Sequence, residues 1–208
     1  MAFKEASWDW VQQLPDTAAA TSKWGAIGDW DVSGVKDFTY AFSPDRDATG
    51  GSYLDNGNPK AATFVGTDLS KWKTTALTSL DNTFKKAMAM NSDLSGWNVG
   101  KVTNLKGTFL DAFKFAGIGL SSWITTSLTT MHSTFWGATL VNVDFGGWDV
   151  SRVTSLQYTF RSATNYVRSF STPLPSALVL LNKHATTQCF VPHTLESSPR
   201  VRLPCSTS

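Results

Sequence analysis

The chain has 208 residues, with 18 Lys and Arg against 16 Asp and Glu, so its formal net charge is only +2. A hydrophobic content of 41% excludes a wholly disordered chain, and the weak net charge gives no electrostatic case for a nucleic-acid partner. The longest apolar run, Ala177–Leu181, is far shorter than the roughly 18–20 residues that cross a bilayer. We therefore expect a folded chain without a membrane span.

The first 24 residues are predicted to form an N-terminal cap. Trp8, Val11 and Leu14 fit the apolar face of a helix that Pro15 would end, and such a helix would cover the open side of the unit that follows. No basic region followed by an apolar stretch is present here, so no secretory signal is expected in this form. The sequence leaves the compartment unknown.

An internal repeat dominates the rest of the sequence. From the second anchor onward the repeats are 25, 26 and 25 residues apart, whereas the first gap is 42 residues and so contains an insertion. The anchors are five tryptophans: Trp30, Trp72, Trp97, Trp123 and Trp148. Position numbers below count from the tryptophan of each unit, so that position 12 is the twelfth residue after it.

A phenylalanine column follows the tryptophans at position 12. Apolar residues also recur at positions 5, 8 and 15. Because steps of three, four and three residues trace one face of an α-helix, we expect a short helix in each unit, with Ser or Thr at position 3 as its N-cap. The turn-rich residues before each tryptophan are predicted to form a brief strand. The column consists of Phe42, Phe84, Phe109, Phe135 and Phe160.

These elements predict an α/β fold, a right-handed leucine-rich-repeat-like solenoid of about 25-residue units, each a short strand plus a short helix. A single unit cannot cover its own apolar face, so stacking would turn the Trp and Phe columns into the interior. The predicted organisation is an N-terminal cap over 1–24, a repeat solenoid over 25–166 with an insertion at about 43–65, and an irregular basic tail over 167–208.

The units read most clearly as Asp-Leu-Ser-Gly-Trp-Asn-Val-Gly-Lys-Val-Thr-Asn-Leu over 93–105 and Gly-Trp-Asp-Val-Ser-Arg-Val-Thr-Ser-Leu over 147–156. This pattern resembles the BspA-like family of leucine-rich-repeat proteins, and the resemblance covers about residues 25–166. It implies a right-handed solenoid without known catalysis. Its bacterial relatives are surface-exposed adhesins or binding proteins, and the type is also numerous in protists and algae. The chain departs from the family in carrying Ala where a Cys or small residue usually follows the Phe.

The insertion supplies the weak candidates for a binding site. Its carboxylates and amides could offer oxygen ligands to calcium, but the spacing of an EF-hand is not met, so we predict no metal site and interpret the segment as a solvated, partner-contacting loop. The candidate binding residues are Asp45, Asp47, Tyr53, Asp55 and Asn56.

No catalytic pattern is found elsewhere. His184, Cys189, His193 and Cys205 do not have the spacing of a standard zinc site, and the chain has no phosphate-binding glycine loop, nucleophile elbow or His-Glu-x-x-His motif. We therefore predict a protein that is not an enzyme, with no catalytic residues and no cofactor.

The sequence favours a non-catalytic protein-binding or scaffolding repeat protein that docks onto a larger partner or assembly. One alternative is a peripheral accessory subunit of an organellar membrane complex, such as a photosynthetic one. Another is a stand-alone surface adhesin, carbohydrate-binding or ice-binding protein, because Thr recurs at positions 6 and 11 and stacking would align these residues into ladders. The competing interpretation of the ladders is that their hydroxyls bond neighbouring backbone.

Overall fold

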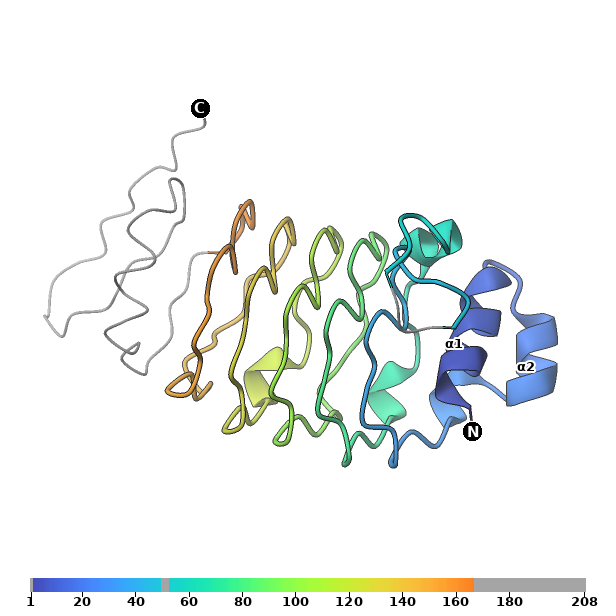
Figure 1. The fold of residues 1–208 in the computed structure, drawn as a ribbon, viewed down its shortest axis with the longest axis horizontal. Coiled ribbons are helices and arrows are strands. Elements are labelled where there is room, and N and C mark those ends of the chain that lie inside the picture. Colours follow the sequence, from blue (N-terminus) through green and yellow to red (C-terminus); the bar gives the residue numbers. More distant parts are fainter. Residues whose placement is uncertain (1, 50–52, 167–208) are drawn as a thin grey trace, which may run out of the picture.

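The computed structural model describes residues 2–49 and 53–166, which form a row of similar coils with two helices at the N-terminal end (Figure 1). These helices, α1 (Phe3–Gln12) and α2 (Ala18–Trp24), contact each other. Two helices therefore stand where the sequence predicted a single one ended by Pro15. Short 3-10 helices follow along the chain: η1 (Ile27–Asp29), η2 (Pro59–Thr63), η3 (Leu69–Lys71) and η4 (Leu120–Ser122).

The predicted α/β solenoid of strand-and-helix units is wrong. Within 2–49 and 53–166 the only α-helices are α1 and α2, and no β-strand is present. The reason lies at positions 10 and 14, where the backbone is left-handed: in the Trp72 unit Asn82 has φ 51° and Lys86 has φ 58°. A residue with positive φ cannot continue an α-helix, so the apolar spacing of three, four and three residues is produced by consecutive turns instead.

Alternate backbone N–H groups in each coil bond to the next coil. In the Trp72 unit, the N–H of Leu80 donates to Asn104 O at 2.9 Å, and that of Phe84 donates to Thr108 O at 2.9 Å. The intervening N–H groups close turns within the coil, as Thr83 does on Leu80 O at 3.2 Å. One isolated parallel bridge per junction lies at position 7, joining in order Asp37, Ser79, Asn104, Thr130 and Ser155. The coils are thus held in register without a regular sheet.

The predicted helix N-caps are also replaced by turns. In the Trp30, Trp97 and Trp148 units the acceptor is the Asp or Asn side chain at position 1, which bonds the backbone N–H at position 3. Asp149 Oδ1 accepts from Ser151 at 2.9 Å, and Asn98 Oδ1 accepts from Gly100 at 3.1 Å. Position 3 therefore contributes a backbone donor rather than a capping hydroxyl, which explains why Gly100 is tolerated there.

The anchor tryptophans are buried, which confirms the prediction that they line the interior. Their indoles stack between coils, with ring centroids 5.9 Å apart for Trp72 and Trp97 and 5.7 Å apart for Trp123 and Trp148. From Trp72 onward each anchor indole also donates its Nε1–H to a carbonyl of the preceding coil; for Trp97 the acceptor is Leu69 O at 2.8 Å. The column therefore combines apolar burial with a directional bond between coils.

The phenylalanine column runs through all five coils. Successive rings are stacked at centroid distances of 5.6, 5.7, 5.6 and 5.4 Å from Phe42 to Phe160. The alanines at position 15 are also buried, from Ala87 to Ala163. Side chains at positions 8, 12 and 15 thus fill the core, together with the buried threonines at position 11.

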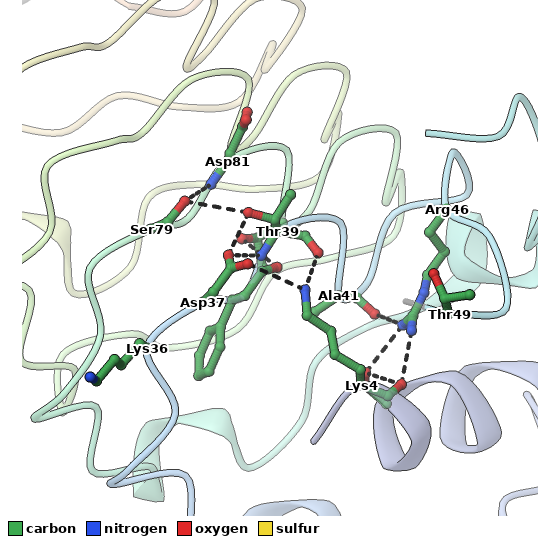
Figure 2. A network of polar contacts seen from close by, with 12 residues as sticks. Lys4, Lys36, Asp37, Thr39, Ala41, Arg46, Thr49, Ser79 and Asp81 are labelled. Carbon is green, nitrogen blue, oxygen red and sulfur yellow. Dashed lines mark hydrogen bonds and ion pairs between the residues drawn. The ribbon is translucent and has the colours of Figure 1, made fainter. Parts of the chain in front are cut away.

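A polar network ties the N-terminal helix α1 to the first coil (Figure 2). The guanidinium of Arg46 is buried and donates to Lys4 O at 2.9 Å, to Ser7 Oγ at 3.1 Å and to Ala41 O. Lys4 Nζ donates in turn to Thr39 O at 2.6 Å. These contacts join the helix to the backbone of the first coil, at the base of the insertion.

Candidate functional site

Positions 9, 10, 13 and 14, most of which are at least partly exposed, follow one another along the coils and are here called the turn face. Neighbouring coils lie side by side here because their backbones are bonded; for example, the N–H of Gly107 at position 10 donates to the oxygen of His132 at position 9 of the next unit, at 2.9 Å. The insertion lies at one end of the turn face, and the last two described coils lie at the other. Residues of both signs and several aromatic rings gather on it, so it is the candidate functional surface of the described residues.

Asp45 is the most deeply placed of the candidate residues. Its side chain is buried, and its Oδ2 lies 2.9 Å from Lys85 Nζ and 3.0 Å from Lys86 Nζ. Burial by itself raises the pKa of Asp45, but hydrogen bonds from Lys85 and Lys86 outweigh it and bring the pKa below its ordinary value. The carboxylate therefore carries a negative charge that two lysines of the next coil already compensate, and it anchors the insertion to that coil.

Three other candidates gather around the same lysines. Tyr53 is 59% exposed, and Lys85 Nζ lies 5.1 Å from the centre of its ring. Asp55 pairs with Lys86 at 3.6 Å, and the backbone N–H of Asn56 donates to Asp45 Oδ1 at 3.4 Å. These residues form a salt-linked, partly aromatic surface rather than a set of converging metal ligands.

Asp47 is held by a different contact. Its Oδ1 accepts a hydrogen bond from Thr49 Oγ1 at 2.6 Å. Nowhere in 2–49 and 53–166 do three or more His, Cys, Asp or Glu side chains come together as a metal site would require. The widely spaced His and Cys residues from His184 onward lie outside the described residues, as does the whole predicted tail over 167–208.

The other end of the turn face carries a cluster that the sequence reasoning missed. We call it the arginine platform: His132, Trp136, Tyr158 and Arg161. The ring of Tyr158 lies 5.5 Å from that of Trp136 and 5.9 Å from that of His132, and the guanidinium of Arg161 lies 4.7 Å from the Trp136 ring. Its signal in the sequence was the register: Trp136 and Arg161 share position 13 of neighbouring units, outside the apolar positions.

Asp111 lies in the middle of the turn face, where burial makes its negative charge unfavourable. It occupies the left-handed position 14 with φ 56°, and its Oδ1 lies 2.2 Å from where a Cβ on Gly137 would stand, so a side chain at Gly137 would displace this carboxylate. Burial raises the pKa of Asp111 above its ordinary value, although Lys86 and Lys85 partly oppose the shift.

We expect Asp111→Asn to stabilise the protein at neutral pH. A raised pKa means that the folded state binds a proton more tightly than the unfolded chain, so this carboxyl favours folding below its unfolded pKa and loses that contribution as the pH rises through its folded pKa. Asn has the same shape, tolerates left-handed backbone and carries no charge. The midpoint temperature of thermal unfolding at pH 7 should be about 1–3 °C higher than that of the unaltered protein. This difference in midpoint should shrink toward pH 4.

Asp149→Asn is the matched control. Its carboxylate bonds Ser151, which lowers its pKa, and Asn98 fills the same position in another unit. This variant should not gain stability at neutral pH. Equal gains for both variants, or a gain for Asp111→Asn that does not change with pH, would refute the role assigned to the Asp111 charge.

The threonine columns bond backbone, as the competing interpretation predicted. At position 11, Thr83 donates to Phe38 O at 3.1 Å and Thr134 donates to Leu105 O at 2.8 Å. At position 6, Thr78 donates to Lys36 O at 3.0 Å and Thr129 donates to Thr103 O at 2.9 Å. The hydroxyl protons of both columns are thus donated to the preceding coil, and the ladders are part of how the coils are held together.

A family model described as "Mycoplasma protein of unknown function, DUF285" matches residues 54–172, more than half of the chain. The matched range begins inside the insertion and extends past the last coil that the structure describes. No curated protein and no solved structure matches the chain. Within the described residues, no helix has the length and apolar character that crossing a membrane would require.

Proposed function

This chain belongs to the DUF285 family, and we propose that it is a non-catalytic protein-binding or scaffolding repeat protein that docks onto a larger partner through its turn face. The resemblance to BspA-like binding proteins supports this proposal. A second support is that the aromatic columns fill the core, whereas the turn face presents partly exposed rings and charged groups.

The observation that carries the proposal is the pair of clusters at the two ends of the turn face. At one end, exposed Tyr53 lies beside Lys85 and near the ring of Tyr40, at 6.3 Å. At the other end lies the arginine platform. Tyr, Trp and Arg are the residue types that contribute most to binding energy at protein interfaces. A partner that reaches both clusters would contact five coils at once, which suits a scaffold.

Affinity capture from native extract tests this proposal. The immobilised full chain is compared with Tyr53→Ala and Trp136→Ala, one at each end of the turn face. Ile124→Ala is the matched control, because Ile124 is an apolar residue with 66% exposure at position 1, outside the turn face. We expect a stoichiometric protein partner that both turn-face variants lose at least in part and that the control retains.

Two results would overturn the proposal. One is the absence of any stoichiometric partner, together with elution of the native protein as a free monomer in size-exclusion chromatography of the extract. The other is a partner that Ile124→Ala loses as readily as the turn-face variants, which would place the binding surface elsewhere. Thermal unfolding of each variant shows that a loss of binding does not arise from a loss of fold.

A further inference from the structure

The arginine platform holds a guanidinium in place by stacking rather than by an ion pair. Arg161 is exposed, and its guanidinium lies 4.7 Å from the Trp136 ring and 5.4 Å from the Tyr158 ring. Among the ion pairs of the described residues none involves Arg161. Contact with two rings restrains the planar group, and these rings offer its N–H donors no anionic acceptor.

The insertion end of the turn face is different in this respect. There the cations Lys85 and Lys86 already face Asp45, and Lys86 also faces Asp55. The two clusters therefore offer a partner different chemistry. One end is a salt-linked surface, and at the other a guanidinium that has no ion pair among the described residues lies beside large rings. This guanidinium is the group that gains most from a new anionic partner.

The net charge of the protein around the arginine platform indicates which kind of anion it can bind. The whole chain carries +2 and residues 167–208 carry +3, so residues 1–166 carry −1. His132 adds little positive charge near neutral pH, because burial, and to a lesser extent Lys106, lowers its pKa below the ordinary value. Polyanions such as nucleic acids bind arrays of several cations. One guanidinium between large rings instead fits one carboxylate flanked by apolar groups.

We propose that the arginine platform is the recognition site for an acidic peptide segment of the protein partner. The guanidinium of Arg161 binds a Glu or Asp carboxylate through paired N–H donors, and the rings of Trp136 and Tyr158 contact the apolar side chains beside that carboxylate. This inference rests on the proposed function, since it names the chemistry of the partner that the turn face binds.

The test uses the full-length protein labelled with ¹⁵N and follows the indole Nε1–H signal of Trp136, identified by its disappearance in Trp136→Phe. One probe is an acetylated, amidated peptide that alternates glutamate with leucine, and the second has glutamine in place of glutamate. The third is a heparin-derived hexasaccharide. We expect the glutamate peptide to shift the Trp136 signal. The glutamine peptide should bind at least about tenfold more weakly, which is the loss typical of one charge-assisted contact.

Arg161→Gln should weaken glutamate-peptide binding by a similar factor. Arg152→Gln is the matched control, because Arg152 is also exposed and in the same unit but at position 4, outside the turn face, and it should bind as the unaltered protein does. Equal binding of the two peptides, indifference to Arg161→Gln, binding of the hexasaccharide alone, or no shift with any probe would each overturn the inference. If it fails while Tyr53→Ala still loses the partner in extract, the proposed function stands.

Discussion

Replacing Trp97 by alanine is expected to destabilise the protein by about 3–5 kcal/mol. The indole is 4% exposed, stacks on Trp72 at 5.9 Å and packs edge-on against Phe38 at 5.6 Å. Its loss opens a cavity in the centre of the stack and leaves Leu69 O without the bond that it accepts at 2.8 Å. Urea unfolding followed by circular dichroism measures the change in the free energy of unfolding. The dependence of this free energy on urea concentration shows whether the coils still unfold together in one transition.

Trp136→Ala is the control for this prediction. Trp136 lies at position 13 of the Trp123 unit, so it is outside the anchor column, and it is half-buried on the turn face. Its removal should cost under about 1 kcal/mol, because the site opens to solvent. If the two alanine variants unfolded at the same urea concentration, the assignment of the anchor column to the interior would be wrong.

Arg46→Ala should cost about 3–4 kcal/mol and loosen the N-terminal helix. Arg46 is buried without a carboxylate at ion-pair distance in the described residues, and burial lowers the pKa of its guanidinium to about 10, so it stays protonated at pH 7. Its removal takes away the donor that Arg46 provides to the carbonyls of Lys4 and Ala41 and to the hydroxyl of Ser7. Urea unfolding gives the free-energy change, and hydrogen exchange of the α1 amides shows where protection is lost.

The exposed Arg161 provides the matched control, since Arg161→Ala removes the same side chain from the turn face. It should change the free energy of unfolding by less than about 1 kcal/mol and leave exchange in α1 unaltered. Uniformly faster exchange in every coil of Arg46→Ala, rather than a local effect on α1, would contradict the role of Arg46 as the link between the helix and the first coil.

The sequence predicts which side chains are inside but not the backbone that places them there. The Trp and Phe columns are buried as their spacing indicated, because hydrophobic burial follows position in the repeat whatever the local backbone. The helix prediction failed because steps of three and four residues are shared by helices and by a run of four-residue turns. Only the left-handed residues tell the two apart, and Lys86 and Tyr158 are not residue types that favour that conformation.

The candidate site was predictable in part. The acidic residues of the insertion were found from composition, but their partners Lys85 and Lys86 belong to the following coil, and only the stacking brings them to Asp45. Arg46 gave no signal, because a lone Arg in a polar loop is usually exposed. Trp136 and Arg161 occupy position 13 in adjacent units. If position 13 had been recognised as a surface position, stacking of the units would have predicted that the two residues lie together.

Hydrogen bonds between the turns of neighbouring coils hold the repeat together, and scalar coupling across these bonds tests this arrangement most directly. In a ¹⁵N,¹³C-labelled sample, the amide nitrogen of Phe84 should couple to the carbonyl carbon of Thr108, whose oxygen accepts its hydrogen bond at 2.9 Å. A coupling from Phe84 to the carbonyl of Leu80 would instead reveal an α-helix within the unit and contradict the account.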